Sequence, residues 1–395
     1  MLSHLRYLRR ATVAALVLVL LMAAVPLSAQ QQAPPPPPST TKPQPAPPEA
    51  GGPTGDTGPM ALPKKKEETP EPKPPKAQKI EGMPEYSIHV NVPLVSVPVL
   101  VATKDGQFIP GLKQGNFKVF EDGVEQKVTK FEISEAPITA VLLVEFANTN
   151  YLFMNDALRA SYVFADSLKK NDWVAVISFD MRSYILTDFT QDKRAVFDAL
   201  NQLRTPGFSE TNVYDALYDT LDRVAAIDGR KYVMLISGGC DTFSRLTFDK
   251  MLKKIKETPD VTIFTLSTGE VLRMWAEAQG LGSRQGIFPC SSTLDYLQAD
   301  NQMATFARMT GGRWYKPRFE GELPEIFRDV ASNIRNQYVL AYQPTNPKLD
   351  GSYRKLKVQV VGPDGGPLKV KDQKNKDLKF NVYAREGYTA KHEVE

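Results

Sequence analysis

The sequence has few of the residues that build metal centres and nucleophilic active sites. It contains two cysteines, Cys240 and Cys290, and three histidines among 395 residues. This small supply argues against a zinc site, which takes its ligands mainly from Cys and His. The histidines are His4, His89 and His392, and none has a plausible serine or cysteine beside it in sequence. A Ser–His–Asp triad is therefore disfavoured, although residues distant in sequence can meet in a fold.

Other signatures of catalysis and of nucleic-acid binding are also missing. Ser237 is not framed by Gly-x-Ser-x-Gly, and the glycines near 238 and 311 are not followed by the Lys-Ser/Thr of a phosphate-binding loop. The net charge of +4 falls to +1 when Arg6, Arg9 and Arg10 of the leader are left out. A nearly neutral protein has no general electrostatic reason to bind nucleic acid.

The first 29 residues are typical of a secretory signal. A basic start precedes an apolar stretch over 11–27, and Leu27-Ser28-Ala29 offers small residues for cleavage. We predict cleavage after Ala29. An uncleaved anchor helix is the alternative, and it would be the only contact with a membrane. The protein is expected in the periplasm, in the cell envelope or outside the cell. In such an oxidising compartment Cys240 and Cys290 can pair; two unpaired buried thiols are the alternative.

Residues 30–82 are predicted to be a disordered linker. Of the 31 prolines in the chain, 16 fall between residues 30 and 79. Runs such as PPPPP at 34–38 favour extended polyproline conformation and cannot form a packed core. We interpret the segment as a semi-stiff tether, with a proline-rich ligand for a partner as the alternative.

The remaining chain predicts a doubly wound, mostly parallel α/β domain over 137–345. Strands are expected at 139–146, 173–180, 231–237, 261–267, 312–316 and 337–343, with an edge strand near 183–188. Helices are expected at 153–170, 191–203, 212–227, 246–257, 299–310 and 322–336. Segments rich in Val that alternate with polar residues flank this domain at 83–136 and 346–395. We predict that they pair into one small β-sandwich-like domain.

Several segments of the chain together resemble a von Willebrand factor type A (VWFA) related family first described from acidobacteria. They are VSVPVLVATKDGQFIPGLKQGNFKVFEDGVEQKVTKFE, AVLLVEFANTN, TNVYDALYDTL, RKYVMLISGGCDT and IRNQYVLAYQPTN followed by DGSYRKLKVQV. The resemblance covers about residues 90–390. It implies an exported VWFA module that is not an enzyme.

The VWFA metal site is degenerate in this sequence. Family members carry Asp-x-Ser-x-Ser, a Thr from a second loop and an Asp from a third, which suit Mg²⁺ or Mn²⁺. The resemblance aligns these positions with Glu145, Ala147, Thr149, Thr211 and Gly238. Two ligands are lost, and Asp241 is a candidate substitute for one of them. We expect Glu145, Thr149, Thr211 and Asp241 to serve as loop caps or solvated acids, with a rebuilt Mg or Mn site as the alternative.

The loops around this position carry aromatic residues suited to binding a protein. The predicted face consists of 145–153, 207–212 and 238–244, with Tyr151, Phe153, Phe208 and Phe243 as candidate contacts. We therefore predict an exported, non-catalytic module for adhesion or scaffolding at the cell envelope, with a protein partner. The alternatives are a metal-dependent binder and, less favoured, a hydrolase acting in a cleft between the α/β and β parts.

Overall fold

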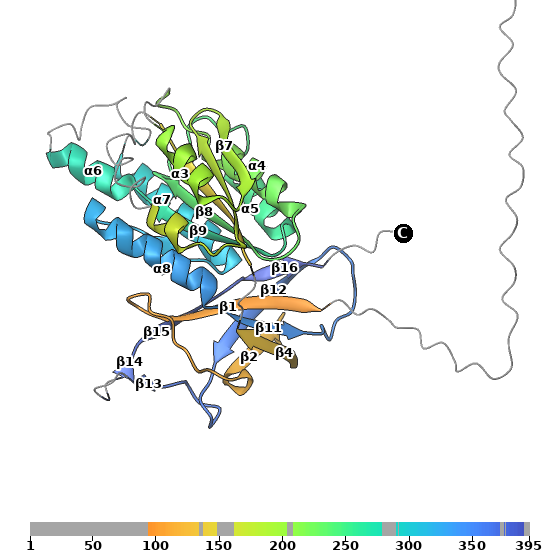
Figure 1. Ribbon diagram of the computed structural model, residues 1–395. Helices are drawn as coiled ribbons and strands as arrows, with labels where there is room; N and C mark the ends of the chain where they lie inside the picture. The colour runs from red at the N-terminus through yellow and green to blue at the C-terminus, as the bar shows by residue number, and fades with distance from the viewer. Residues whose placement is uncertain are drawn as a thin grey trace, which may run out of the picture. The chain divides into compact units, whose positions relative to one another are not determined.

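The computed structural model describes residues 94–133, 137–147, 162–203, 208–278, 290, 292–371, 375 and 377–390 (Figure 1). All of them belong to one unit, Tyr86–Glu395. The predicted leader and linker lie outside the described residues, as do Thr149, Tyr151 and Phe153. Within the described ranges, no helix combines the length and apolar character needed to cross a membrane.

A six-stranded sheet forms the centre of the α/β part. Its strands are β5 (Thr139–Glu145), β6 (Trp173–Phe179), β7 (Ser183–Thr190), β8 (Lys231–Ser237), β9 (Val261–Ser267) and β10 (Trp314–Tyr315). Their spatial order is β10-β9-β8-β5-β6-β7, and only the edge strand β7 runs antiparallel to its neighbour. This is the 3-2-1-4-5-6 order of doubly wound α/β folds. The predicted fold class is confirmed.

Helices cover both faces of this sheet, because its central strands are apolar on both sides. The helices are α3 (Lys193–Asn201), α4 (Val213–Ala225), α5 (Phe248–Glu257), α6 (Gly269–Ala278), α7 (Thr293–Thr310) and α8 (Leu323–Arg335). Leu142 of β5 joins a core with residues of α3 and α8, whereas Leu143 joins a second core with residues of α4, α5 and α7. Helix α7 begins six residues before the expected start, because Ser292 and Asp295 form a reciprocal capping box.

The segments before and after the α/β part build two further sheets. One has the order β15-β1-β11-β4, from β1 (Val95–Thr103), β4 (Val128–Ile133), β11 (Tyr338–Tyr342) and β15 (Phe380–Ala384). The other has the order β16-β12-β2-β3, from β2 (Phe117–Glu121), β3 (Val124–Gln126), β12 (Tyr353–Val360) and β16 (Gly387–Thr389). Both sheets contribute to a third core. The pairing of β1 with β15 and of β2 with β12 confirms the expected β domain built from both segments.

Short elements complete the described part of the chain. They are the 3-10 turns η1 (Gln114–Asn116) and η3 (Glu320–Glu322), and a small ribbon of β13 (Val370–Lys371) with β14 (Asp377–Leu378).

One strand lies in a different sheet from the expected one. The sequence pattern predicts that 337–343 belongs to the α/β sheet, but β11 pairs antiparallel with β1 and β4. Its side chains Tyr338, Leu340 and Tyr342 pack in the core of the β part. A short run buried on both faces fits the centre of either kind of sheet, so periodicity does not separate the two cases. The hydroxyl of Tyr338, which donates to the Ile109 carbonyl at 2.8 Å, also finds its partner in the β part.

A buried ion pair joins the two chain segments of the β part. Glu121 of β2 and Arg354 of β12 lie 3.0 Å apart, and both side chains are 3% exposed. The second carboxylate oxygen of Glu121 accepts hydrogen bonds from the hydroxyls of Tyr342 and Tyr388, at 2.5 and 2.9 Å. Because buried charges are tolerated only when paired and hydrogen-bonded, this network fixes how β2, β11, β12 and β16 meet.

Candidate functional site

The switch point of the sheet lies between β5 and β8. The helical residues 162–167 that follow β5 along the chain contribute Phe164 and Ala165 to one core, whereas α5, which follows β8, contributes to the other. Neighbouring strands whose connections leave toward opposite faces open a crevice at their carboxyl ends, where open α/β sheets bind ligands. Glu145 ends β5 and Ser237 ends β8, so both lie at this point.

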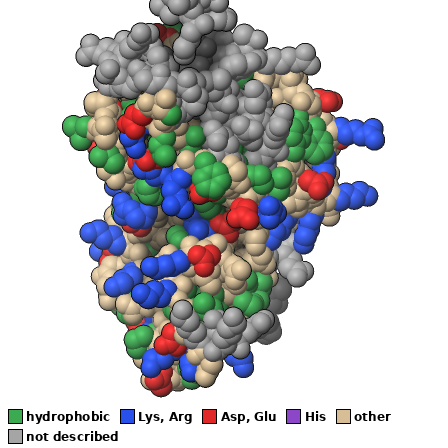
Figure 2. Space-filling view, turned by 90° about the vertical axis from the view of Figure 1, so that its left-hand side faces the viewer, with side chains coloured by type: hydrophobic (Ala, Val, Ile, Leu, Met, Phe, Trp, Pro, Cys, Tyr) green, Lys and Arg blue, Asp and Glu red, His purple; other side chains and the backbone are tan. Residues whose placement is uncertain are grey.

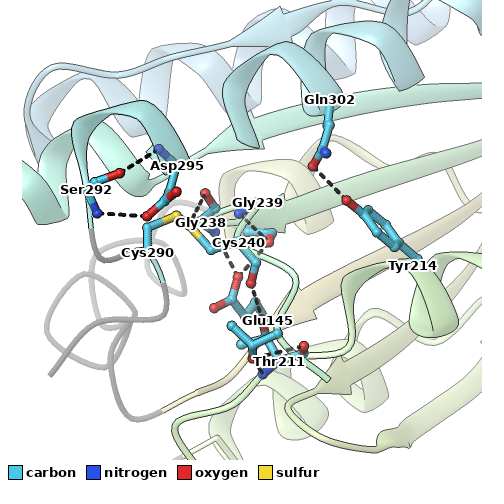
Figure 3. Close-up of a disulfide and its surroundings, with 12 residues drawn as sticks. Glu145, Thr211, Tyr214, Gly238, Gly239, Cys240, Cys290, Ser292, Asp295 and Gln302 are labelled. Atoms are coloured by element: carbon cyan, nitrogen blue, oxygen red, sulfur yellow. Dashed lines mark hydrogen bonds between the residues drawn. A yellow bond between two sulfur atoms is a disulfide. The ribbon is translucent and has the colours of Figure 1, made fainter. Parts of the chain in front are cut away.

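The Glu145 side chain is buried and hydrogen-bonded to the loop after β8. Its Oε2 atom accepts the Ser237 hydroxyl at 2.5 Å and the Gly238 N–H at 2.8 Å. The Ser237 hydroxyl in turn accepts the Gly239 N–H at 2.8 Å. Glu145 is only 2% exposed. The carboxyl group therefore fastens the end of β5 to the Ser237–Gly239 turn (Figure 3).

Burial changes the acidity of this carboxyl group. It raises the pKa of Glu145 from 4.5 to about 7, against the opposing effect of the hydrogen bonds from Ser237 and Gly238. The negative charge of Asp241 adds a smaller upward shift. Near neutral pH the group is thus divided between its protonated and its charged form, whereas a strand-end acid in water is charged.

Thr211 holds the neighbouring loop to the same turn. It is completely buried, and its hydroxyl donates to the Cys240 carbonyl at 2.5 Å. Its own carbonyl accepts the N–H groups of Thr242 and Phe243 at 2.9 and 2.8 Å. Figure 3 shows Glu145 and Thr211 together below the Gly238–Cys240 turn. Hydrogen bonds of the main chain and of the Thr211 hydroxyl therefore connect the loop before α4 to the loop after β8.

Asp241 is bonded to the start of α4 and to its own loop. One carboxylate oxygen accepts the Ser244 hydroxyl at 2.5 Å and the Tyr214 N–H at 3.3 Å. The Ser244 hydroxyl also accepts the N–H groups of Tyr214 and Asp215, each at 3.1 Å. These contacts satisfy donors of the first turn of α4, which have no partner within the helix. Burial raises the pKa of Asp241.

The candidate metal-site residues that the structure describes are each hydrogen-bonded to protein groups. No group of three or more His, Cys, Asp and Glu side chains among them is placed to hold a metal ion. Glu145 and Asp241 are each committed to protein hydrogen bonds, and the Thr211 hydroxyl proton is used by Cys240. A Cβ atom at Gly238 would lie 3.8 Å from both Glu145 Oε2 and Thr268 Oγ1, so a third-loop carboxylate would start beside Glu145. Thr149 lies outside the described residues.

Cys240 and Cys290 form a disulfide with a Cα–Cα distance of 5.7 Å, which selects one of the two states left open by the sequence. The bond joins the loop after β8 to the segment that enters α7 (Figure 3). Both cysteines pack with Ala299 and Tyr296 of α7. The loop that carries Phe243 is thereby held to α7 as well as to Thr211.

Two of the four predicted aromatic contacts are exposed on these loops. Phe208 is 46% exposed and Phe243 is 49% exposed. Because the Phe243 N–H bonds to the Thr211 carbonyl, the segments that carry the two rings run next to each other. Tyr151 and Phe153 lie outside the described residues.

Sequence reasoning missed the residues that complete this site. Ser237 and Ser244 supply hydroxyls to Glu145 and Asp241, and Tyr296 packs on the disulfide. Ser237 ends β8 and Glu145 ends the neighbouring strand β5. The strand order alone therefore suggests Ser237 as a partner of Glu145. Tyr296 had no such signal, because nothing in the sequence places α7 beside the loop after β8.

Comparison with known proteins finds matches among solved structures. No family model matches the sequence, and no curated protein matches it. Among solved structures, it is similar to a von Willebrand factor type A protein from Catenulispora acidiphila, with 10% identity, a TM-score of 0.39 and 75% of each chain covered. The vWF domain of the type V pili tip protein Mfa5 from Porphyromonas gingivalis has 13% identity and a TM-score of 0.34, over 51% of this chain and 96% of that one.

The PilB minor pilin from Streptococcus sanguinis is a third such structure, with 10% identity and a TM-score of 0.38. The match covers 51% of this chain and 62% of that chain, so it spans less than two thirds of the pilin. The fold class stated above rests on the strand order of this chain itself.

Proposed function

We propose that this chain is an exported, non-catalytic module of the VWFA type, with a degenerate metal site, that binds a protein partner in the cell envelope. The binding surface is the loop face at the switch point, around Phe208 and Phe243. The observation that carries the proposal is the state of Glu145. The acid at the ligand-binding position is buried and bonded to Ser237 and Gly238, while the adjacent loops present exposed aromatic rings.

The surroundings of the loop face agree with this role. The disulfide between Cys240 and Cys290 suits an oxidising compartment outside the cytoplasm. The loop that carries Phe243 is held to Thr211, to α4 and to α7, so the Phe243 ring stands on an anchored backbone. The backbone of this loop is then ordered before the partner binds, which lowers the entropic cost of association.

A photo-crosslinking amino acid at position 243, in the full chain expressed in its own cells, tests the loop face. We expect one discrete crosslinked protein from position 243. Trp173, at the opposite end of the sheet and 44% exposed, is the matched control position. The same adduct from both positions would show that the loop face is not the binding surface.

The identified partner then allows affinities to be measured. We expect Phe208→Asp combined with Phe243→Asp to weaken binding at least tenfold, since losing buried aromatic contacts at an interface costs about 2 kcal/mol or more. Trp173→Asp should leave the affinity unchanged. Unchanged binding in the double variant would contradict the proposal.

Chelation separates this proposal from the metal-dependent alternative. We expect the same affinity in excess chelator as in millimolar Mg²⁺ or Mn²⁺. Loss of binding in chelator with recovery on adding either ion would instead establish a rebuilt site that includes Glu145 and Thr211.

A further inference from the structure

A long groove runs where α5 and α7 meet the β part. It consists of two adjoining hollows of about 810 and 480 Å³, which share Arg308, Leu356, Lys357 and Glu386 in their walls. The larger hollow lies over the outer surface of β2 and β12, and the smaller one lies between β12, β15 and the end of α7. Figure 2 shows Lys and Arg side chains gathered around a hollow at mid-height of one face of the molecule. The groove is separate from the loop face described above.

The groove is positively charged although the protein as a whole is nearly neutral. The cations that line it are Lys256, Lys355, Lys357, Arg308 and Arg385, and Glu386 is the one carboxylate among the lining residues of the two hollows. Arg308 is paired with Glu386. Both Lys355 and Lys357 are exposed. Apolar surface from Leu252, Met309 and Trp314 lies between these charges.

The backbone of β12 is open at Val358 on the side that faces the smaller hollow. Asp122 donates to the Lys355 carbonyl and Val361 donates to the Asn116 carbonyl, so odd-numbered residues of β12 face β2. Even-numbered residues face the other way, and Leu356 there donates to the Glu386 carbonyl at 2.8 Å. The strand β16 covers that side along Tyr353–Lys355, and Pro367 bridges Val361 at the far end of β12. Val358 therefore directs its N–H and C=O into the groove.

The opposite wall is a second strand edge. β15 ends its sheet, with β1 as its only paired strand among the described residues. Lys104 donates to the Lys379 carbonyl, and this sets the alternation so that Val382 turns its backbone groups away from β1. Val382 and Val358 line the same hollow of about 480 Å³. Two strand edges thus flank one basic groove.

We propose that this groove binds an extended acidic peptide segment of another protein by β-strand addition. The segment continues the sheet beyond β16, at Val358, between the positions where Glu386 and Pro367 contact β12. Its main chain bonds to the backbone of Val358, its carboxylates face Lys355 and Lys357, and its alternate apolar side chains rest on the uncharged part of the groove. Exposed strand edges are recognised in this way, with backbone bonds giving affinity and side-chain contacts giving specificity. The local excess of positive charge selects an acidic sequence.

The test uses the full chain and a ten-residue synthetic peptide of alternating Glu and Val, with binding followed by calorimetry. We expect saturable binding at one site. Lys355→Glu combined with Lys357→Glu should weaken it at least tenfold. The matched control, Lys250→Glu with Lys253→Glu on the exposed surface of α5, changes the charge equally and should leave the affinity within twofold.

A second peptide, N-methylated at alternate residues, separates strand addition from simple charge attraction. We expect it to bind at least tenfold more weakly, since methylation removes the main-chain donors that a strand edge requires. Equal binding of both peptides, or equal loss in the two pairs of lysine variants, would overturn the proposal. Tighter binding of a single-stranded oligonucleotide of the same charge would overturn it as well. A groove occupied by a second copy of this chain would show as peptide-sensitive dimerisation in light scattering, and this result too would contradict binding to another protein.

Discussion

At the scale of single residues, Glu145 shows how a buried acid can hold a turn of the fold together. A carboxylate at the end of a central strand is well placed to meet a cation, and the sequence frame around Glu145 still resembles a metal site. In this structure the carboxyl group bonds to the Ser237 hydroxyl and to the Gly238 N–H. It stabilises the turn after β8 rather than presenting oxygens to solvent.

The raised pKa of Glu145 predicts a specific dependence of stability on pH. The protonated form is the one favoured in the folded state, so its contribution is complete below 4.5 and is lost as the pH rises through about 7. That difference in pKa corresponds to roughly 3 kcal/mol. Glu145→Gln, which carries no charge, should gain stability relative to the natural protein by up to about this amount between pH 4 and pH 8.

Denaturant unfolding at several pH values measures this difference. Glu125→Gln, at a site where the carboxyl side chain is 54% exposed, controls for the loss of one negative charge. Parallel stability curves for the natural protein and Glu145→Gln would show that the buried acid does not titrate in this range.

At the scale of elements, the loop after β8 is held at Cys240 by one hydrogen bond and by one disulfide. Thr211 holds it from the side of α4, and the disulfide holds it from the side of α7. The two cysteines are 50 residues apart, and closing a loop of that length stabilises a protein by about 4 kcal/mol in the chain-entropy model.

Replacing both cysteines, Cys240→Ser with Cys290→Ser, should therefore lower the free energy of unfolding by about 2–4 kcal/mol. Urea unfolding under non-reducing conditions checks this value. Reductant should destabilise the natural protein and leave the double variant unchanged. An equal response of both proteins to reductant would mean that the disulfide does not stabilise the fold.

At the scale of the whole molecule, the strand that follows the last helix of the α/β part belongs to the β part. This determines where a fragment containing only the α/β part must end. All five residues of β11 are buried, between β1 and β4 of the β part. Helix α8 ends at Arg335, directly before this strand. A fragment that ends after β11 carries an apolar strand without its partners.

We expect fragment 137–336 to be monomeric and to unfold cooperatively, whereas fragment 137–345 should self-associate through its unpaired strand. Light scattering coupled to size exclusion, at matched concentrations, makes the comparison. Two monomeric fragments of equal stability would contradict the assignment of β11 to the β part.

Much of the secondary structure could be predicted because it depends on local patterns. Strands β8 and β9 occupy 231–237 and 261–267 as expected, and β5 ends at Glu145, one residue before the expected end. The error at β11 came from the same source, since YVLAY is apolar enough for the centre of either sheet. The candidate site was predicted in part: Glu145 and Thr211 lie at the switch point, whereas Ser237 lies 92 residues from Glu145 and was not foreseen as its partner.

The sequence by itself determined the order of strands and helices and the alternation of apolar residues, because these follow from side chains a few residues apart. It therefore determined the α/β class and the division into a central unit with flanking β segments. Only the tertiary structure decided which partners those elements have. In the tertiary structure Cys240 pairs with Cys290, and Glu145 is buried against Ser237. Strand β11 belongs to the β part, and Val358 of β12 and Val382 of β15 line one groove. Each of these outcomes depends on the balance of burial and hydrogen bonding between residues far apart in the chain, which no local pattern records.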